Sequence, residues 1–240
     1  MNILVTGVSK SLGLETARIM LHKGWNVYGV SRTQSAEITD LISKFKNSFR
    51  WLNYDLENTE DIPKTIFKEW IGNEIAIDGL VNNAAIAYDD LVTNMRIAEL
   101  EALFRINVYS PMMLTKYAIR QMLLHRNRLS IVHVSSISTH TGYKGLSMYA
   151  SSKGAIEAFS KNIAREWGEH GVRSNCVVPG FMETTMNEIL TNEQKDRIYK
   201  RTSLKKPVDI KSVASLISFL LSDDANSITG QNYFVDNGTI

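Results

Sequence analysis

The sequence predicts an α/β fold: one doubly wound parallel sheet of about seven strands with helices on both faces. Short apolar runs alternate with longer stretches of helical periodicity along the whole chain. Such strand–helix alternation builds a parallel sheet through right-handed crossovers. The chain has 240 residues, of which 44% are hydrophobic and 22% charged. This size and composition suit one globular domain with a sizeable core, so we expect residues 1–240 to form a single domain.

Seven short apolar runs are the expected strands. They are Asn2–Thr6, Asn26–Val30, Ser48–Tyr54, Ile77–Val81, Ser130–Ser135, Arg173–Val178 and Tyr233–Asp236. The expected helices begin near Leu12, Ala36, Glu60, Ile97, Ser147 and Asp209. No linker rich in proline, glycine or serine divides the chain. Residues 180–206 are polar and weakly periodic, so we expect an irregular segment there that acts as a mobile lid over a substrate.

Composition narrows the partners and the compartment. The formal net charge is +2, and no basic run stands out, which argues against a nucleic-acid partner. No apolar run approaches the ~20 residues that a membrane-spanning helix needs, and because the N-terminus enters a strand directly we expect no signal peptide. The one cysteine, Cys176, lies in an apolar stretch, and we expect it to be buried and inert. We therefore expect a cytoplasmic protein in a reducing compartment.

The stretch TGVSKSLG, residues 6–13, lies between the first strand and the first helix. In a doubly wound fold, phosphates bind at this turn because glycine allows close backbone approach and the helix N-terminus offers free N–H groups. Gly7 and Gly13 meet that need. A triphosphate-binding loop is disfavoured, because Leu14 stands where that loop has lysine. The stretch indicates the dinucleotide site of a Rossmann-type fold, although taken alone it is also compatible with a purely structural turn.

The end of the second strand favours NADPH over NADH. Enzymes that use NADH place an acidic residue there to bind the ribose hydroxyls. No acidic residue occurs from Gly24 to Ala36, and Ser31 and Arg32 follow the strand instead. A guanidinium suits a 2′-phosphate, and Lys10 in the glycine loop adds a second cation. The expected cofactor is therefore NADP(H).

Tyr149 and Lys153 are four residues apart in a helical stretch and so share one face. We expect the lysine cation to bring the tyrosine pKa from ~10 toward neutrality, which suits a general acid or base. Ser136, at the end of the fifth strand, is placed to bind a substrate oxygen. An isolated tyrosine–lysine pair of this spacing also occurs by chance, but its agreement with the glycine loop favours a catalytic pair. No set of residues predicts a metal site.

Together these residues resemble the short-chain dehydrogenase/reductase family, over essentially the whole chain. Beyond the glycine loop, the matching stretches are NNAA at 82–85, RINVYS at 105–110, PGFMET at 179–184 and ITGQNYFVDNG at 228–238. The resemblance implies four catalytic residues, Asn107, Ser136, Tyr149 and Lys153. It implies contacts to the cofactor from Gly7, Ser9, Lys10, Ser11, Leu12, Gly13, Ser31, Arg32, Asp55, Leu56, Asn83, Ala84, Tyr149, Lys153, Pro179, Gly180, Met182 and Thr184. It implies contacts to the substrate from Ser136, Ser138, Leu146 and Tyr149.

The resemblance also implies a mechanism. NADPH delivers hydride to a carbonyl carbon, Tyr149 protonates the oxygen, and Ser136 holds that oxygen. Lys153 lowers the tyrosine pKa and binds the nicotinamide ribose, while Asn107 holds a water that relays protons. Two positions depart from the family pattern, because Ser11 and Ala85 stand where glycine is usual.

Within the family, the likeness is greatest to the 3-oxoacyl-[acyl carrier protein] reductases of fatty acid biosynthesis, which act on 3-oxoacyl thioesters. In that group surface arginines receive the acyl carrier protein, and Arg126 or Arg128 matches one such position. The other position holds His170, and Leu146 replaces a usual glutamine. The alternatives are another ketone or secondary alcohol (a sugar, a steroid-like alcohol or a secondary metabolite) and, from a different class, a non-catalytic nucleotide sensor.

The resemblance further implies a homo-oligomer, a tetramer or dimer, built through the two long helices near 98–126 and 147–169. Two histidines near the expected site need a separate interpretation. His133, between valines on a strand, is expected to be packed in the core. His140 follows Ser136 closely, and whether it lines the substrate pocket stays open.

Overall fold

The computed structural model describes residues 1–184 and 191–239, and these residues confirm the predicted fold class. All seven strands are parallel and form one sheet in the order β3-β2-β1-β4-β5-β6-β7. The strands are β1 Asn2–Thr6, β2 Asn26–Ser31, β3 Phe49–Asn53, β4 Gly79–Asn82, β5 Leu129–Val134, β6 Val172–Pro179 and β7 Asn232–Val235. Each overlaps its predicted run. The largest difference in a boundary is at β4, which begins two residues later than predicted. Asp78, just before it, bonds to Asn2 through both its backbone and its side chain.

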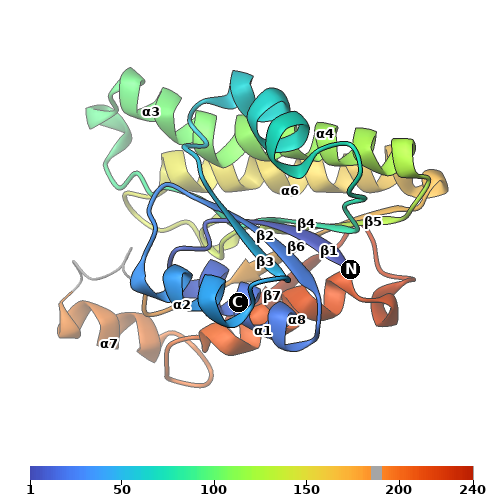
Figure 1. The fold of residues 1–240 in the computed structure, drawn as a ribbon. Helices are drawn as coiled ribbons and strands as arrows, with labels where there is room; N and C mark the ends of the chain where they lie inside the picture. The colour runs from blue at the N-terminus through green and yellow to red at the C-terminus, as the bar shows by residue number, and fades with distance from the viewer. Residues whose placement is uncertain (185–190, 240) are drawn as a thin grey trace.

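Helices cover both faces of the sheet (Figure 1). One face carries α3, α4 and α6, and the other carries α1, α2 and α8. The α-helices are α1 Ser11–His22, α2 Ala36–Lys44, α3 Ile97–Phe104, α4 Ser110–His125, α5 Ser138–Thr141, α6 Ser147–Trp167, α7 Asn192–Lys200 and α8 Ile210–Leu221. The short 3₁₀ segments are η1 Thr59–Asp61, η3 Val92–Asn94, η5 Gly168–His170 and η7 Asp223–Ala225, and two π-helical segments are η2 Pro63–Ile71 and η4 Arg105–Tyr109.

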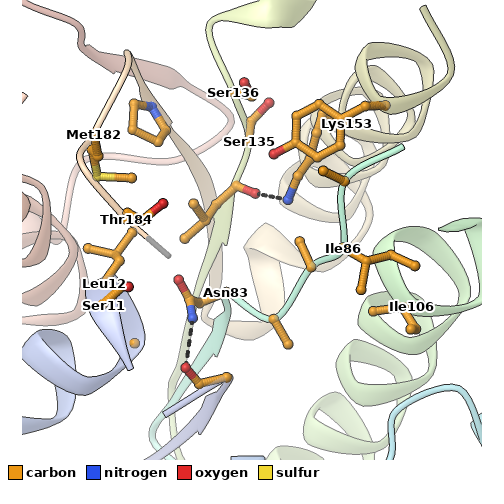
Figure 2. Close-up of a pocket in the computed structure, with 18 of the residues that line it drawn as sticks. Ser11, Leu12, Asn83, Ile86, Ile106, Ser135, Ser136, Lys153, Met182 and Thr184 are labelled. Carbon is orange, nitrogen blue, oxygen red and sulfur yellow. Dashed lines mark hydrogen bonds between the residues drawn. The ribbon is translucent and has the colours of Figure 1, made fainter. Parts of the chain in front are cut away.

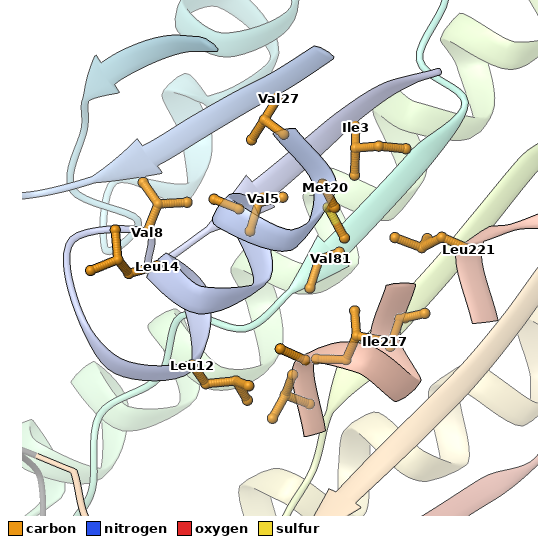
Figure 3. Close-up of a cluster of buried hydrophobic side chains, with 14 of the residues drawn as sticks. Ile3, Val5, Val8, Leu12, Leu14, Met20, Val27, Val81, Ile217 and Leu221 are labelled. Carbon is orange, nitrogen blue, oxygen red and sulfur yellow. The ribbon is translucent and has the colours of Figure 1, made fainter. Parts of the chain in front are cut away.

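Two buried layers hold the helices to the sheet. In one, side chains of β1 such as Ile3 and Val5 pack against Met20 of α1 and Ile217 of α8 (Figure 3). These side chains have no solvent exposure. A second cluster joins the opposite face of the sheet to η2, α4 and α6. Because central parallel strands are covered on both faces, they appear in the sequence as continuous apolar runs, which explains why these runs predicted them well.

The structure differs from the sequence expectation in two helical regions. The long helix expected near 98–126 is interrupted, because the π-helical η4 separates α3 from α4. The segment expected to be an irregular lid contains α7, which a capping box between Thr191 and Gln194 begins. Residues 185–190 of that expected lid lie outside the described residues.

The strands all end at the same edge of the sheet. From β1 the chain builds outward to β2 and β3, then returns to add β4 on the other side of β1. The carboxyl ends of β1 and β4 therefore flank a topological switch point, where doubly wound folds bind ligands. The turn after β1, which contains Gly7, and the turn after β4, which contains Asn83, meet there. In the described ranges, no helix has the length and apolar character needed to cross a membrane.

Candidate active site

A cleft of about 800 Å³ opens at the carboxyl edge of the sheet. Every residue that the sequence analysis assigned to cofactor or substrate contact lines it. Among the predicted site residues, Asn107 alone is absent from the lining. Motifs separated by more than 170 residues are therefore brought to one cavity. Figure 2 shows Ser11 and Leu12 near Met182 and Thr184 on one side, with Ile86 and Ile106 on the other.

The glycine loop is tightly packed at Gly7 and Gly13. A Cβ atom on Gly13 would lie 2.1 Å from the backbone oxygen of Gly7. Gly7 has φ +74°, and a Cβ there would lie 2.8 Å from the amide nitrogen of Asn83. Only glycine fits these two positions without moving the backbone. The loop thus keeps the shape that close approach to a pyrophosphate requires.

Ser11, the departure from the glycine pattern, is accommodated in this loop. Its φ is +50°, in the left-handed region that glycine normally occupies. For a serine this conformation costs about 1–2 kcal/mol. The loop therefore retains its turn despite the side chain. Lys10 is the N-cap of α1, and within the described chain no side chain caps this helix. The first-turn N–H groups of α1 are thus available to an anion such as a phosphate.

Thr6 and Asn83 join the turns after β1 and β4. The Thr6 hydroxyl donates to the carbonyl of Val81 (3.2 Å) and accepts from the backbone N–H groups of Asn83 and Ala84 (both 3.0 Å). The Asn83 side chain donates to the carbonyls of Thr6 (2.9 Å) and Gly7 (3.4 Å; Figure 2). Because these bonds are internal to the protein, the floor of the cleft is rigid without any ligand.

The end of β2 carries the predicted cation. Arg32 lies 3.8 Å from the carboxylate of Asp55, and 59% of its side chain is exposed. The neighbouring Ser31 is buried and is held by a bond from the indole of Trp51 (2.9 Å). Leu56 is buried beside Asp55, and its carbonyl accepts a hydrogen bond from Ser110. Arg32 and Asp55 thus form the outer end of the cleft on a firmly packed base.

Lys153 is the most deeply buried cation of the cleft, with 4% exposure. Its ammonium donates to the backbone carbonyl of Val134 (2.8 Å; Figure 2). Burial lowers the pKa of Lys153 to about 8, partly offset by Cys176. Lysine in this state exchanges its proton close to neutral pH, which suits a group that passes protons.

Tyr149 lies one helical turn before Lys153, and the lysine nitrogen is 5.8 Å from the centre of its ring. Burial raises the pKa of Tyr149 to about 12; a hydrogen bond with Ser136 opposes this shift and the charge of Asp89 adds to it. The expectation that Lys153 brings this pKa toward neutrality is therefore wrong for the site as the structure describes it. The ammonium of Lys153 donates to the Val134 carbonyl, and burial is the largest cause of the raised Tyr149 pKa. Tyr149 is thus protonated at neutral pH, as a proton donor must be.

Ser136 follows β5 and is supported by its neighbour Ser138. The backbone N–H and the hydroxyl of Ser138 lie 3.2 Å and 3.0 Å from the Ser136 Oγ. The next backbone N–H, of Ile137, donates to the carbonyl of Pro179 (3.0 Å), which links this turn to the end of β6. The hydroxyl of Ser136 is therefore presented to the cleft near Tyr149 by a turn with fixed ends.

Asn107 lies behind the cleft rather than in it. It is 1% exposed and belongs to the π-helical segment η4. Its amide oxygen accepts from the N–H of Ile86 (2.9 Å), and its amide nitrogen donates to the Ile86 carbonyl (2.9 Å) and to Ser152 (3.1 Å). Asn107 therefore fixes the cleft-lining residue Ile86 to α6. The described contacts give it a supporting role, and the predicted relay water stays a prediction.

The segment after β6 forms the remaining wall. A Cβ on Gly180 would lie 2.8 Å from the backbone of Asp236, so glycine allows β6 and the turn after β7 to touch. Pro179, Gly180, Met182 and Thr184 all line the cleft, as predicted.

Sequence reasoning missed several residues that line the cleft. Among them, Asp89, Lys144 and Arg201 are charged and line the same cleft. Burial raises the pKa of Asp89. In the described part of the chain, none of the three forms an ion pair within 4 Å. The AIAYDDL stretch after NNAA carried a signal for Asp89, because it follows a strand that ends at the site, and Arg201 falls within residues 180–206, the segment expected to be a lid. No sequence signal pointed to Lys144.

Other predicted residues lie elsewhere. Arg126, Arg128 and His170 are near the amino ends of β5 and β6, at the edge of the sheet opposite the reacting residues. His133 is fully buried beside Asn82 (3.1 Å), which confirms that it is packed in the core, and burial lowers its pKa to about 3. His140 does not line the cleft but pairs with Glu157. Cys176 is buried with its pKa raised to about 12, as expected of an inert thiol.

The residues present fit a dinucleotide. At one part of the cleft, the uncapped N-terminus of α1 lies next to the glycine loop of Gly7 and Gly13. The cations Lys10 and Arg32 also line the cleft. Residues 7–239 match a family model described as Enoyl-(Acyl carrier protein) reductase. The chain belongs to the short-chain dehydrogenase/reductase family. It is an oxidoreductase of alcohol and ketone groups that uses a nicotinamide cofactor.

Relatives agree over nearly the full chain. The 3-oxoacyl-[acyl-carrier-protein] reductase FabG of Buchnera aphidicola subsp. Schizaphis graminum is 33% identical over 237 residues, covering 98% of this chain and 95% of that protein. Nodulation protein G of Rhizobium meliloti is 30% identical over 235 residues, with coverage of 98% and 95%. A solved 4-hydroxyisoleucine dehydrogenase complexed with NADH superposes with a TM-score of 0.92 at 23% identity, covering 99% and 98%. That last similarity supports the fold alone.

Proposed function

We propose that this chain is an NADPH-dependent carbonyl reductase that converts a 3-oxoacyl thioester to its 3-hydroxyacyl product, in the manner of 3-oxoacyl-[acyl carrier protein] reductases. The observation that carries the proposal is the meeting of Ser136, Tyr149 and Lys153 at one cleft. The relatives named 3-oxoacyl-[acyl-carrier-protein] reductase FabG, 32–33% identical over 237 residues, support the substrate class. A place in fatty acid biosynthesis or a dedicated acyl pathway follows from that substrate.

The proton chemistry favours reduction. A bound nicotinamide supplies hydride to the carbonyl carbon. The Ser136 hydroxyl donates a hydrogen bond to the carbonyl oxygen, and Tyr149 protonates that oxygen as negative charge develops on it. Its pKa of about 12 keeps the tyrosine protonated until then. Lys153, with a pKa of about 8, then stands one helical turn away to return a proton to the tyrosinate.

The outer cations support NADPH as the cofactor. Arg32 and Lys10 line the cleft at the positions where a 2′-phosphate is read in this fold. The ion pair of Arg32 with Asp55 is long and exposed, so it is worth at most about 1 kcal/mol. A phosphate therefore displaces Asp55 from Arg32 at little cost. NADH lacks the 2′-phosphate and cannot make this contact with Arg32.

The charges at the substrate end suit a carrier-bound acyl group. Leu146 gives the pocket an apolar wall for a short acyl chain. Lys144 and Arg201 offer two cations to the phosphate of a pantetheine arm, whether on coenzyme A or on an acyl carrier protein. The earlier candidates for carrier docking, Arg126 and Arg128, lie at the far edge, roughly 25 Å from Ser136 at about 3.3 Å per strand residue. We therefore favour Lys144 and Arg201, rather than Arg126 and Arg128, as the residues of this chain that bind the phosphate of a carrier whose acyl group enters this cleft.

A second candidate is the same chemistry on another ketone or secondary alcohol, such as a sugar or an amino-acid derivative. Asp89 favours it, because a carboxylate near Tyr149 can accept hydrogen bonds from substrate hydroxyl or ammonium groups. The deciding experiment compares kcat/KM for an acetoacetyl thioester with that for a panel of polar ketones. A thioester preference of at least 100-fold supports the first proposal, and the reverse preference supports the second.

We also propose a homo-oligomer for this chain. Tyr109, Leu123 and Leu124 are 50%, 47% and 62% exposed along η4 and α4, and they supply an apolar face for a second copy. The segment around α7 is proposed as the substrate lid, since Ile198 and Arg201 reach the cleft lining. A cytoplasmic location fits both the proposed cofactor and the carrier.

A further inference from the structure

A carboxylate outside the expected catalytic set connects the reacting residues. Glu157 lies in α6, four residues after Lys153 and eight after Tyr149, so all three share one face of that helix. Its side chain is only 11% exposed. The resemblance to the family implies no role for Glu157.

Four side chains from three neighbouring segments surround this carboxylate. Its Oε1 accepts hydrogen bonds from the hydroxyls of Ser135, at the end of β5, and Thr139 of α5 (2.9 Å). Its Oε2 accepts from the amide of Asn232 in β7 (2.7 Å). The His140 Nε2 lies 3.0 Å and 3.2 Å from the two oxygens. Three donors and the histidine nitrogen therefore surround the carboxylate, which offers about four acceptor sites.

Two of these donors, Ser135 and Thr139, lie on either side of Ser136, the residue proposed to bind the substrate oxygen. Ser135 immediately precedes Ser136, and Thr139 follows it by three residues. The Thr139 hydroxyl also lies 2.9 Å from the Ser136 carbonyl. Glu157 thus holds both ends of the turn that presents Ser136, and it does so from the helix that carries Tyr149 and Lys153.

We propose that Glu157 is a positioning residue that sets the placement of Ser136 relative to Tyr149. It contributes no proton to the reaction and touches neither substrate nor cofactor. Its effect on turnover passes through the Ser136 hydroxyl. A misplacement of a reacting group by about 1 Å can cost about 100-fold in rate, so a tether of this kind has a measurable effect.

The test uses Glu157→Gln, which keeps the size of the side chain but replaces one acceptor oxygen by a donor facing Asn232 or Ser135. We expect kcat to fall about 10- to 100-fold, with the Kd of NADPH unchanged in a fluorescence titration. Glu157→Asp is expected to recover part of the loss. The control is Glu166→Gln, the same chemical change at an exposed position of the same helix, which should retain wild-type kcat.

A double-mutant cycle with Ser136→Ala separates positioning from general structural damage. If Glu157 acts through Ser136, the double variant loses no more kcat than Ser136→Ala alone. Multiplicative losses, or a kcat for Glu157→Gln within twofold of wild type, overturn the proposal. If Glu157→Gln does not fold, Thr139→Val carries the test in the same cycle, with an expected three- to tenfold loss; an unchanged kcat in that variant then overturns the proposal.

The assay rests on the proposed function for its substrate, an acetoacetyl thioester. Wild-type turnover tests that function, whereas the ratio of variant to wild type tests the inference. Crystal structures of both proteins test the inference without any substrate. We expect the distance from Ser136 Oγ to Tyr149 Oη to change by at least about 0.5 Å in the variant, and an unchanged distance contradicts the proposal even if the thioester is not a substrate.

Discussion

Replacing Lys153 by methionine is expected to stabilise the folded protein at neutral pH while abolishing turnover. Lys153 is buried, and no carboxylate in the described part of the chain forms an ion pair with it. Its pKa falls from the usual 10.5 to about 8. At about 1.4 kcal/mol per pKa unit, keeping the ammonium charged in the fold costs about 3 kcal/mol. Methionine carries no charge and avoids this cost.

The sign of the pH dependence follows from the depressed pKa. Below pH 8 the lysine is charged in both the folded and the unfolded chain, so the full cost is present. Between pH 8 and 10.5 the folded form loses its proton first, and the cost disappears as the pH rises. The loss of the bond to Val134 is an opposing term of about 1 kcal/mol that does not depend on pH.

Urea unfolding of wild type and Lys153→Met at pH 7 and pH 10.5 measures the effect. The difference in unfolding free energy between the two proteins should shift by about 3 kcal/mol between these pH values, with the variant favoured at pH 7. Lys161→Met is the control, because Lys161 is exposed on the same helix and should show no such shift. A pH-independent difference between wild type and Lys153→Met would refute the assignment of Lys153 as a buried, uncompensated cation.

Substitutions at four further positions test separate parts of the site. Tyr149→Phe should reduce kcat at least about 1,000-fold while NADPH still binds, because only the proton donor is lost; retained turnover contradicts that role. Arg32→Asp should shift the ratio of kcat/KM toward NADH by about 100-fold, and an unchanged ratio means that the 2′-phosphate is bound elsewhere. Gly13→Ala should lose NADPH binding, since its Cβ would lie 2.1 Å from a backbone oxygen, whereas Gly154→Ala, with nothing within 4 Å, should bind normally and gain up to about 1 kcal/mol of stability. Arg201→Gln should raise the KM for acetoacetyl coenzyme A about tenfold but leave that for an uncharged acetoacetyl thioester unchanged; equal effects on both contradict anion binding by Arg201.

The centre of the sheet was predictable from the sequence because its strands are buried on both faces. Continuous apolar runs such as that of β1 marked these strands, whereas the edge strands β3 and β7 are only partly buried. The predicted site residues other than Asn107 met at one cleft for a related reason: parallel strands place the turns after β1, β4, β5 and β6 at the same edge. Glycine positions were also predictable, since Gly7 and Gly13 are required by the backbone itself.

The remaining features depend on distances across the fold. The pKa of Tyr149 is set by burial and by its neighbours Ser136 and Asp89, none of which its helical spacing encodes. Asp89, Lys144 and Arg201 come from three separate turns with no shared period. In the sequence, Glu157 is one charged residue among others on an amphipathic helix. Its role depends on four hydrogen-bonding partners that come from other segments of the fold.

The most direct test of the central claim is the oxidation of NADPH at 340 nm in the presence of an acetoacetyl thioester, with NADH in a parallel reaction. We predict rapid loss of NADPH and slow loss of NADH, which would also show that Ser11 in its left-handed conformation permits cofactor binding. No loss of NADPH with this substrate, in a protein whose cofactor binding is shown by fluorescence titration, would contradict 3-oxoacyl thioester reduction.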